Sequence, residues 1–321
     1  MRRSLALLLF MFLMAAQSFG QCNVLRDMKK KEHQPVLAAL KASTTVIFLR
    51  TSDQDIQAWE KALKEVWTIS PIEVRSINQI GEYEERMAKP SGYSFLTMVP
   101  MEMLYDGFRT QEPRLQLWIP WSDPEYRYDR ERFDRTIAFL PLDVSIPVAN
   151  CNMQYAYMKP DTTCSVFRSL YTDAVIRNWT PQQIANGLRI VDKHLKEGTP
   201  YLGMQRRWDE VAYPAIFDGT MYICDNALEQ WDLDKHKGWF EVESKKDLLL
   251  TCPKRIIRIS PEELEAKLIA KENFQYITAI RWGRDQLIWV QHSTSGEVVY
   301  FNTGYHLQTA NMAKDLCSGK L

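Results

Sequence analysis

The sequence predicts an α/β (α+β) protein: two related βαβαββ modules with mixed sheets, joined by a partly helical middle segment. Three observations support this prediction. Short β-branched and apolar runs alternate with runs of helical periodicity between residues 220 and 302. The same order of elements occurs earlier, between residues 44 and 121. The composition, with 45% hydrophobic and 25% charged residues, is ordinary for a globular chain.

Residues 1–20 have the pattern of a secretory signal peptide and lie outside the predicted fold. Arg2 and Arg3 give a positive start, Leu5–Ala16 is continuously apolar, and Ser18-Phe19-Gly20 supplies small residues before a cleavage site. The apolar run is shorter than the roughly 20 residues that span a bilayer. We therefore expect an exported mature chain that begins at Gln21 and has no transmembrane segment.

The six cysteines all follow this leader, in a chain expected to reach an oxidising compartment. Cys151 and Cys164 lie close in sequence and are the favoured disulfide, although spacing alone does not fix connectivity. Cys224 ends an apolar strand and fits a buried thiol. Cys22 is the second residue after the leader, next to Gln21, which leaves lipid anchoring open as an alternative.

Module one is expected over residues 44–122, after a polar lead-in over 21–43. Thr44–Leu49 has the composition of a buried strand. Ile56–Trp67 carries apolar residues at helical spacing, and Ser52 is the expected N-cap. The elements that follow are a strand, a helix and two strands, at 72–77, 79–88, 93–99 and 115–121.

The connecting segment, 123–219, is expected to belong to neither module. It contains an apolar strand over Thr136–Leu142 and the clearest helix of the chain, Pro181–Glu197. Thr180 is the expected N-cap of this helix, and Gln183 is expected to complete a capping box. The apolar positions form a single stripe, made by Ile184, Leu188, Val191 and Leu195.

Module two is expected over residues 220–321. Met221–Cys224 is predicted as its first strand, followed by a helix near residues 245–250, a strand over 255–259 and a helix over 261–271. Ser260 begins a capping box with Pro261 at the first helical position. Three strands then end near Asn302.

Two short matches relate the modules. Ile77-Asn78 matches Ile259-Ser260 as a strand end followed by a helix cap. Leu117-Trp118-Ile119 matches Ile288-Trp289-Val290 on the fourth strand. The matches predict an internal duplication in which Trp118 and Trp289 occupy equivalent, buried sites.

The closing hairpin of module two, Leu287-Ile288-Trp289-Val290 with Thr294–Tyr300, resembles that of uncharacterised secreted proteins from Bacteroidota-type bacteria. The resemblance covers module two and, more loosely, module one. It implies a periplasmic or extracellular location and supplies no catalytic residue.

The net charge and the absence of several catalytic motifs reduce the number of function classes that the sequence supports. The 40 basic and 40 acidic residues cancel, which argues against nucleic-acid binding. The chain has no serine-nucleophile elbow, phosphate-binding loop or dinucleotide fingerprint, so no cofactor is predicted. Asp232, Asp234 and His236 could share one strand face and are the weak metal candidates. A polar loop is favoured there, because metal sites draw ligands from several segments.

Eight of the ten tryptophans fall into two groups. Those on apolar stripes or strands are expected in the core because of the area that each ring buries: Trp59, Trp67, Trp118 and Trp289. Those outside such patterns are candidates for a surface aromatic patch: Trp121, Trp208, Trp231 and Trp239.

These observations favour an exported, non-enzymatic binding or structural protein of the bacterial envelope, with an unknown protein or envelope component as its partner. Two alternatives stay open: an exported hydrolase with its site between the modules, and a lipid-anchored subunit of an envelope complex. Acid–base groups converging in a pocket between the modules would favour the hydrolase. An exposed apolar patch or a free sheet edge would favour the binding protein.

Overall fold

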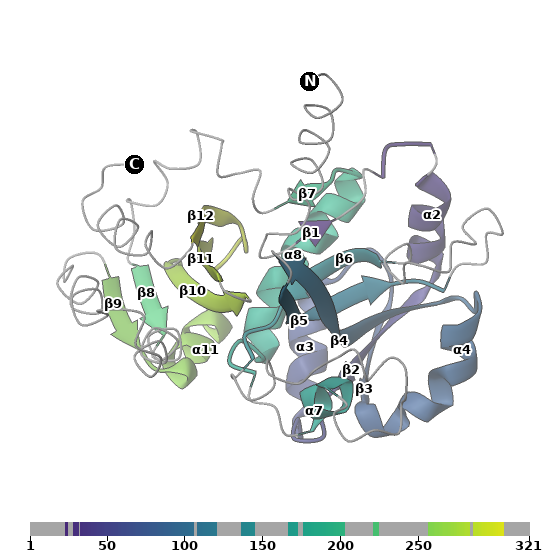
Figure 1. Cartoon of the computed structure of the whole chain (residues 1–321), viewed down its shortest axis with the longest axis horizontal. Helices are drawn as coiled ribbons and strands as arrows, with labels where there is room; N and C mark the ends of the chain where they lie inside the picture. The colour runs from purple at the N-terminus through teal and green to yellow at the C-terminus, as the bar shows by residue number, and fades with distance from the viewer. Residues whose placement is uncertain are drawn as a thin grey trace.

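The structure of the chain is a computed structural model. It describes residues 23–24, 28–31, 33–105, 108–120, 136–144, 166–172, 176–202, 221–224, 256–282 and 285–304. These residues form two mixed sheets with helices packed against them (Figure 1). The predicted α/β class is therefore confirmed. No helix within the described ranges combines the length and the apolar character that crossing a membrane would require.

Sheet one has seven strands in the order β3-β2-β4-β5-β6-β1-β7. In chain order these strands are β1 (Asn23–Val24), β2 (Thr44–Leu49), β3 (Ile72–Ser76), β4 (Tyr93–Tyr105), β5 (Phe108–Trp118), β6 (Thr136–Pro141) and β7 (Tyr201–Leu202). Strand β2 runs parallel to both β3 and β4, whereas the remaining neighbours are antiparallel.

The helical elements that accompany sheet one are α2 (Gln34–Ala42), α3 (Ile56–Val66), the 3₁₀ helix η1 (Ile77–Tyr83), α4 (Glu84–Ala88), α7 (Val166–Tyr171) and α8 (Pro181–Glu197). Helix α3 corrects one expectation. Its N-cap is Asp55, whose carboxylate accepts a hydrogen bond from the Ala58 N–H, and not Ser52. Asp55 directly precedes the first turn, where the unpaired N–H groups are within its reach.

Sheet two has five strands in the order β12-β11-β10-β8-β9. Its elements are β8 (Met221–Cys224), β9 (Ile256–Ile259), α11 (Pro261–Ile269), β10 (Gln275–Trp282), β11 (Asp285–His292) and β12 (Val298–Gly304). Strand β8 is parallel to β9 and β10, and the other pairs are antiparallel. The helix expected near residues 245–250 lies outside the described residues.

Five strands of sheet one repeat the topology of sheet two. Read from one edge, β3-β2-β4-β5-β6 corresponds to β9-β8-β10-β11-β12, with the same parallel and antiparallel neighbours. Strand β6 is thus the fifth strand of the first unit. The expectation that the whole connecting segment belongs to neither module is wrong for this strand, which pairs with β5.

The structure also corrects both short matches. The capping box of η1 begins at Ser76 and not at Asn78, so Ser76 corresponds to Ser260. When the strand registers are followed from these two serines, Phe95 corresponds to Tyr276 and Trp118 to Gln291. The two tryptophans are therefore offset by two residues.

Their burial differs as well. Trp289 is 1% exposed, whereas Trp118 is only partly buried and packs at the margin of the core. Trp118 lies beside Phe95, with ring centroids 5.1 Å apart, and its Nε1–H donates to the Thr97 hydroxyl. The core placement of Trp59 and Trp67 is confirmed, since each is 3% exposed.

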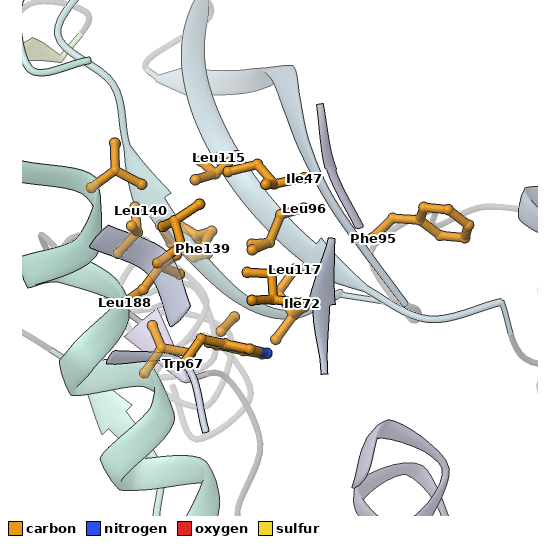
Figure 2. Packing of buried hydrophobic residues seen from close by; sticks show 14 of the residues in the cluster. Ile47, Trp67, Ile72, Phe95, Leu96, Leu115, Leu117, Phe139, Leu140 and Leu188 are labelled. Carbon is orange, nitrogen blue, oxygen red and sulfur yellow. The ribbon is translucent and has the colours of Figure 1, made fainter. Parts of the chain in front are cut away.

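The two faces of sheet one pack differently. Ile47, Leu96 and Leu117 point to the same side as Leu188 of α8, whereas Phe95 points the opposite way (Figure 2). On that opposite side Phe95 joins Phe48 and Tyr83 in an aromatic group beside η1. Sheet one is therefore covered on both faces, and α8 lies on one of them.

Candidate functional site

Helix α8 lies between the two sheets and packs against both (Figure 1). It begins at the N-cap Thr180, which accepts a hydrogen bond from the Gln183 N–H, and ends at Gly198 with φ +68°. Beyond the predicted stripe, further positions are buried: Ala185, Asn186, Gly187, Ile190 and Asp192. Burial around most of the helix shows that α8 has two packed faces instead of one.

The first face of α8 joins sheet one. Gly187 allows close approach to Leu140 of β6, because a Cβ at this position would lie 3.0 Å from the Leu140 Cδ1 atom. The buried Asp192 carboxylate accepts hydrogen bonds from the Thr68 and Ile69 N–H groups at 2.7 and 2.8 Å. These contacts hold the helix to the chain that enters β3.

The second face of α8 joins sheet two. The Asn186 side-chain amide donates to the Tyr276 hydroxyl at 2.9 Å and to the His292 carbonyl at 3.2 Å. Tyr276 in turn donates to the Gln291 amide oxygen at 2.9 Å. Lys193 pairs with Glu297 at 2.9 Å beside the β11–β12 turn. The contacts centre on the turn and on the adjoining strands.

The start of α8 is tied to α11. The Glu265 carboxylate accepts from the Thr180 hydroxyl at 2.6 Å and from the Gln182 N–H at 3.0 Å, and the second bond satisfies one of the unpaired N–H groups of the first turn. The expected capping box is correspondingly incomplete: Thr180 caps the helix, but the Gln183 side chain lines a pocket instead.

This inter-sheet pocket is formed where α8 and β6 meet β10 and β11. It encloses a cavity of about 30 Å³ and is partly open at the surface. Its apolar walls come from Leu140, Pro141, Ile184 and Gly187. Its polar and aromatic walls come from Asn178, Gln183, Tyr276, Thr278, Trp289 and Gln291.

Three polar groups of the pocket have no hydrogen-bond partner among the described residues. The indole Nε1–H of Trp289 is fully buried and unpaired. The Thr278 hydroxyl and the Gln183 side-chain amide also line the pocket without a protein partner there. By contrast, Asn178 donates to the Pro141 carbonyl and accepts from the Asp143 N–H.

The pocket walls are neutral. The residues that line it include no carboxylate, imidazole, thiol or amine. Burial raises the pKa of the Tyr276 hydroxyl, although its hydrogen bond with Asn186 lowers it, so the phenol is protonated across the physiological range. The pocket can donate and accept hydrogen bonds, but its own side chains hold no group that exchanges a proton near neutral pH.

Sheet one has a second place where α/β proteins commonly bind ligands, but other parts of the same chain fill it. Open α/β sheets bind ligands outside the carboxyl ends of neighbouring parallel strands whose connections diverge, here β2 and β4. The Thr51 N–H donates to the Tyr171 carbonyl at 2.9 Å, and the Met98 N–H donates to the Tyr171 hydroxyl at 2.7 Å. Tyr171 is 1% exposed, so α7 closes this crevice.

The site residues expected from sequence fall outside the described residues. They are the metal candidates Asp232, Asp234 and His236, the possible disulfide Cys151 and Cys164, and the aromatic candidates Trp121, Trp208, Trp231 and Trp239. Within the described part of the chain, no group of three or more His, Cys, Asp or Glu side chains could hold a metal. Cys224 is half-buried and carries no disulfide.

Sequence reasoning missed Gln183, Asn186 and Thr278. Asn186 lies on the side of α8 opposite the apolar stripe, where a polar residue is ordinary for a solvent-facing position, so it carried no signal in the sequence. Thr278 gave no signal, because an isolated threonine on a strand is ordinary. No family model, curated protein or solved structure matches this chain.

Proposed function

We propose that the chain is an exported, non-enzymatic binding or structural protein of the bacterial envelope. The observation that carries this proposal is the neutral chemistry of the inter-sheet pocket. A hydrolase needs a positioned acid or base with a pKa near the working pH. The raised pKa of Tyr276 moves that hydroxyl further from this range. Amide, hydroxyl and indole groups around aliphatic walls suit binding instead.

The surface of sheet two supports a partner-binding role. Strand β9 is an end strand of that sheet within the described residues, and its Ile257 is 45% exposed. Ile269, at the end of α11, is 59% exposed. An end strand presents backbone N–H and C=O groups to a partner, and exposed aliphatic side chains add apolar contact area.

The exported location rests on the leader and on the resemblance to secreted proteins. Expression of the full chain in a Gram-negative bacterium, followed by fractionation and intact-mass analysis, tests it. We expect a periplasmic or released product beginning at Gln21. The matched control is Leu8→Arg, which interrupts the apolar run and should leave an uncleaved cytoplasmic chain. A diacylglyceryl adduct on Cys22 would instead establish the anchored alternative.

The binding role is tested by cross-linking in intact cells. We expect a reproducible cross-linked product with one partner from the envelope. Ile257→Glu should lower the yield of this product, whereas Ile56→Glu, at another exposed isoleucine, should leave the yield unchanged and serves as the control. The purified protein should not turn over ester, phosphate or glycoside substrates. Turnover that is lost on substitution of a residue of this chain would contradict the proposal.

A further inference from the structure

We propose that the inter-sheet pocket binds a neutral sugar by admitting its hydroxymethyl group. This inference deepens the proposed function, since it assigns a ligand class to the same pocket. The starting observation is the Trp289 indole: the residue is 1% exposed, its Nε1–H has no partner, and it lines the cavity. A buried unpaired donor is costly, which indicates that an acceptor occupies the space beside it.

The walls indicate what kind of acceptor fits. Trp289 donates only, whereas the Thr278 hydroxyl and the Gln183 amide can each donate and accept. A hydroxyl group matches this set because it accepts from the indole and also donates to a neighbour. The aliphatic walls of Leu140, Pro141 and Ile184 match the C–H groups of a sugar.

The electrostatics exclude a charged ligand. No residue that lines the pocket carries a charge, so an ionised group would be desolvated without an ion partner. Size sets a further limit. The cavity of about 30 Å³ exceeds the roughly 10–15 Å³ that one water molecule needs, so it has room for the end of a ligand while the remainder lies at the opening.

The test follows the indole N–H resonance of Trp289 in ¹⁵N-labelled full-length protein, assigned by its loss in Trp289→Phe. The probes are the methyl glycosides of glucose, galactose and mannose. We expect a saturable shift with at least one, with a dissociation constant on the order of 1 mM for a ligand of this size. Methyl xyloside lacks the hydroxymethyl group, and methyl glucuronide replaces it with a carboxylate, so neither should shift the resonance.

Variants separate binding from folding. Thr278→Val keeps the shape and removes the hydroxyl, so it should weaken binding about tenfold while the thermal midpoint changes little. Thr180→Ser, outside the pocket lining, should bind as the parent does. Absence of a saturable shift with all three hexosides, or equal shifts with the xyloside, would overturn the inference and assign the cavity to water. The envelope role would still be judged by fractionation and cross-linking.

Discussion

Among single residues, Trp118 and Trp289 show why a short sequence match did not establish that two positions are structurally equivalent in the two sheets. Strand side chains alternate with a period of two, so a shift of two residues leaves a side chain on the same face. The triplets around Trp118 and Trp289 therefore matched in pattern although the registers place Trp289 opposite Thr278 and Trp118 opposite Phe95. Only the pairing register of the strands in each sheet distinguishes the two positions.

The difference in burial predicts a difference in energy. Trp289→Ala should lower the free energy of unfolding by about 3–5 kcal/mol, because it removes a fully buried indole and leaves a cavity. Trp118→Ala should cost less, because that side chain is already partly solvated. Chemical denaturation of both variants measures this. Equal losses would contradict the assignment of Trp289 to the core.

The Glu265 carboxyl predicts a pH dependence. Burial raises its pKa, and the hydrogen bonds from Thr180 and Gln182 only partly offset this. The ionised form is therefore penalised in the folded chain at pH values above the raised pKa. Protonation relieves the penalty. The contribution of Glu265 to the free energy of unfolding therefore rises as the pH falls from the pKa of this carboxyl in the folded chain towards its lower pKa in the unfolded chain.

Glu265→Gln should remove that rise while keeping the acceptor for the Gln182 N–H. Urea denaturation at a series of pH values, with parent and variant in parallel, measures the difference. Identical pH profiles for the two proteins would show that the carboxyl is not buried as described.

At the scale of elements, strands and helices were predictable where the hydrophobic period was clear. Strand β2, helix α3 and helix α8 begin and end within a few residues of the sequence prediction. The second packed face of α8 was not predictable from its stripe, because Asn186 looks like a solvent-facing position until sheet two is placed against it. The close approach of Gly187 to Leu140 of sheet one was not predictable from the stripe either. Tertiary packing, not helical period, decides their role.

Two glycines with the same backbone conformation allow a matched comparison: Gly296 lies in the β11–β12 turn, and Gly92 directly precedes β4. Gly92 and Gly296 both have φ +74°, but a Cβ at Gly92 meets open space, whereas one at Gly296 would lie 2.3 Å from the Asn186 carbonyl oxygen. Gly92→Ala should cost about 1–2 kcal/mol, the penalty for an L-residue in the left-handed region. Gly296→Ala should cost more, because the turn must also move away from α8.

Thermal and urea denaturation of the two variants measure this difference, and changes in the amide resonances of Asn186 and Gly187 show whether the turn has moved. Equal losses of stability, with α8 unperturbed, would mean that the turn does not contact the helix.

At the scale of the whole molecule, the order of elements predicted two similar units, and the shared strand order agrees with that prediction. We infer an internal duplication from this topology. The sequence could not assign β6 to the first unit, because an apolar pattern predicts a strand but does not show which other strand it pairs with. Nor could it place the pocket, whose walls come from three parts of the chain that are distant in sequence.

Helix α8 joins both sheets into one structural unit. Trp289 and Val298 of sheet two belong to the same core cluster as Leu188 and the strands of sheet one. A shared core and the hydrogen bonds of Asn186 and Glu265 should therefore make the two sheets unfold together.

Hydrogen exchange measured against denaturant concentration, on peptides from β2–β4 and from β10–β12, shows whether the two sheets unfold as one unit. We predict that the slowest amides of both regions exchange with the same free energy of opening, and that Gly296→Ala lowers both by the same amount. Exchange of β10–β12 through a lower-energy opening that leaves β2–β4 protected would contradict the claim and make sheet two a separate unit.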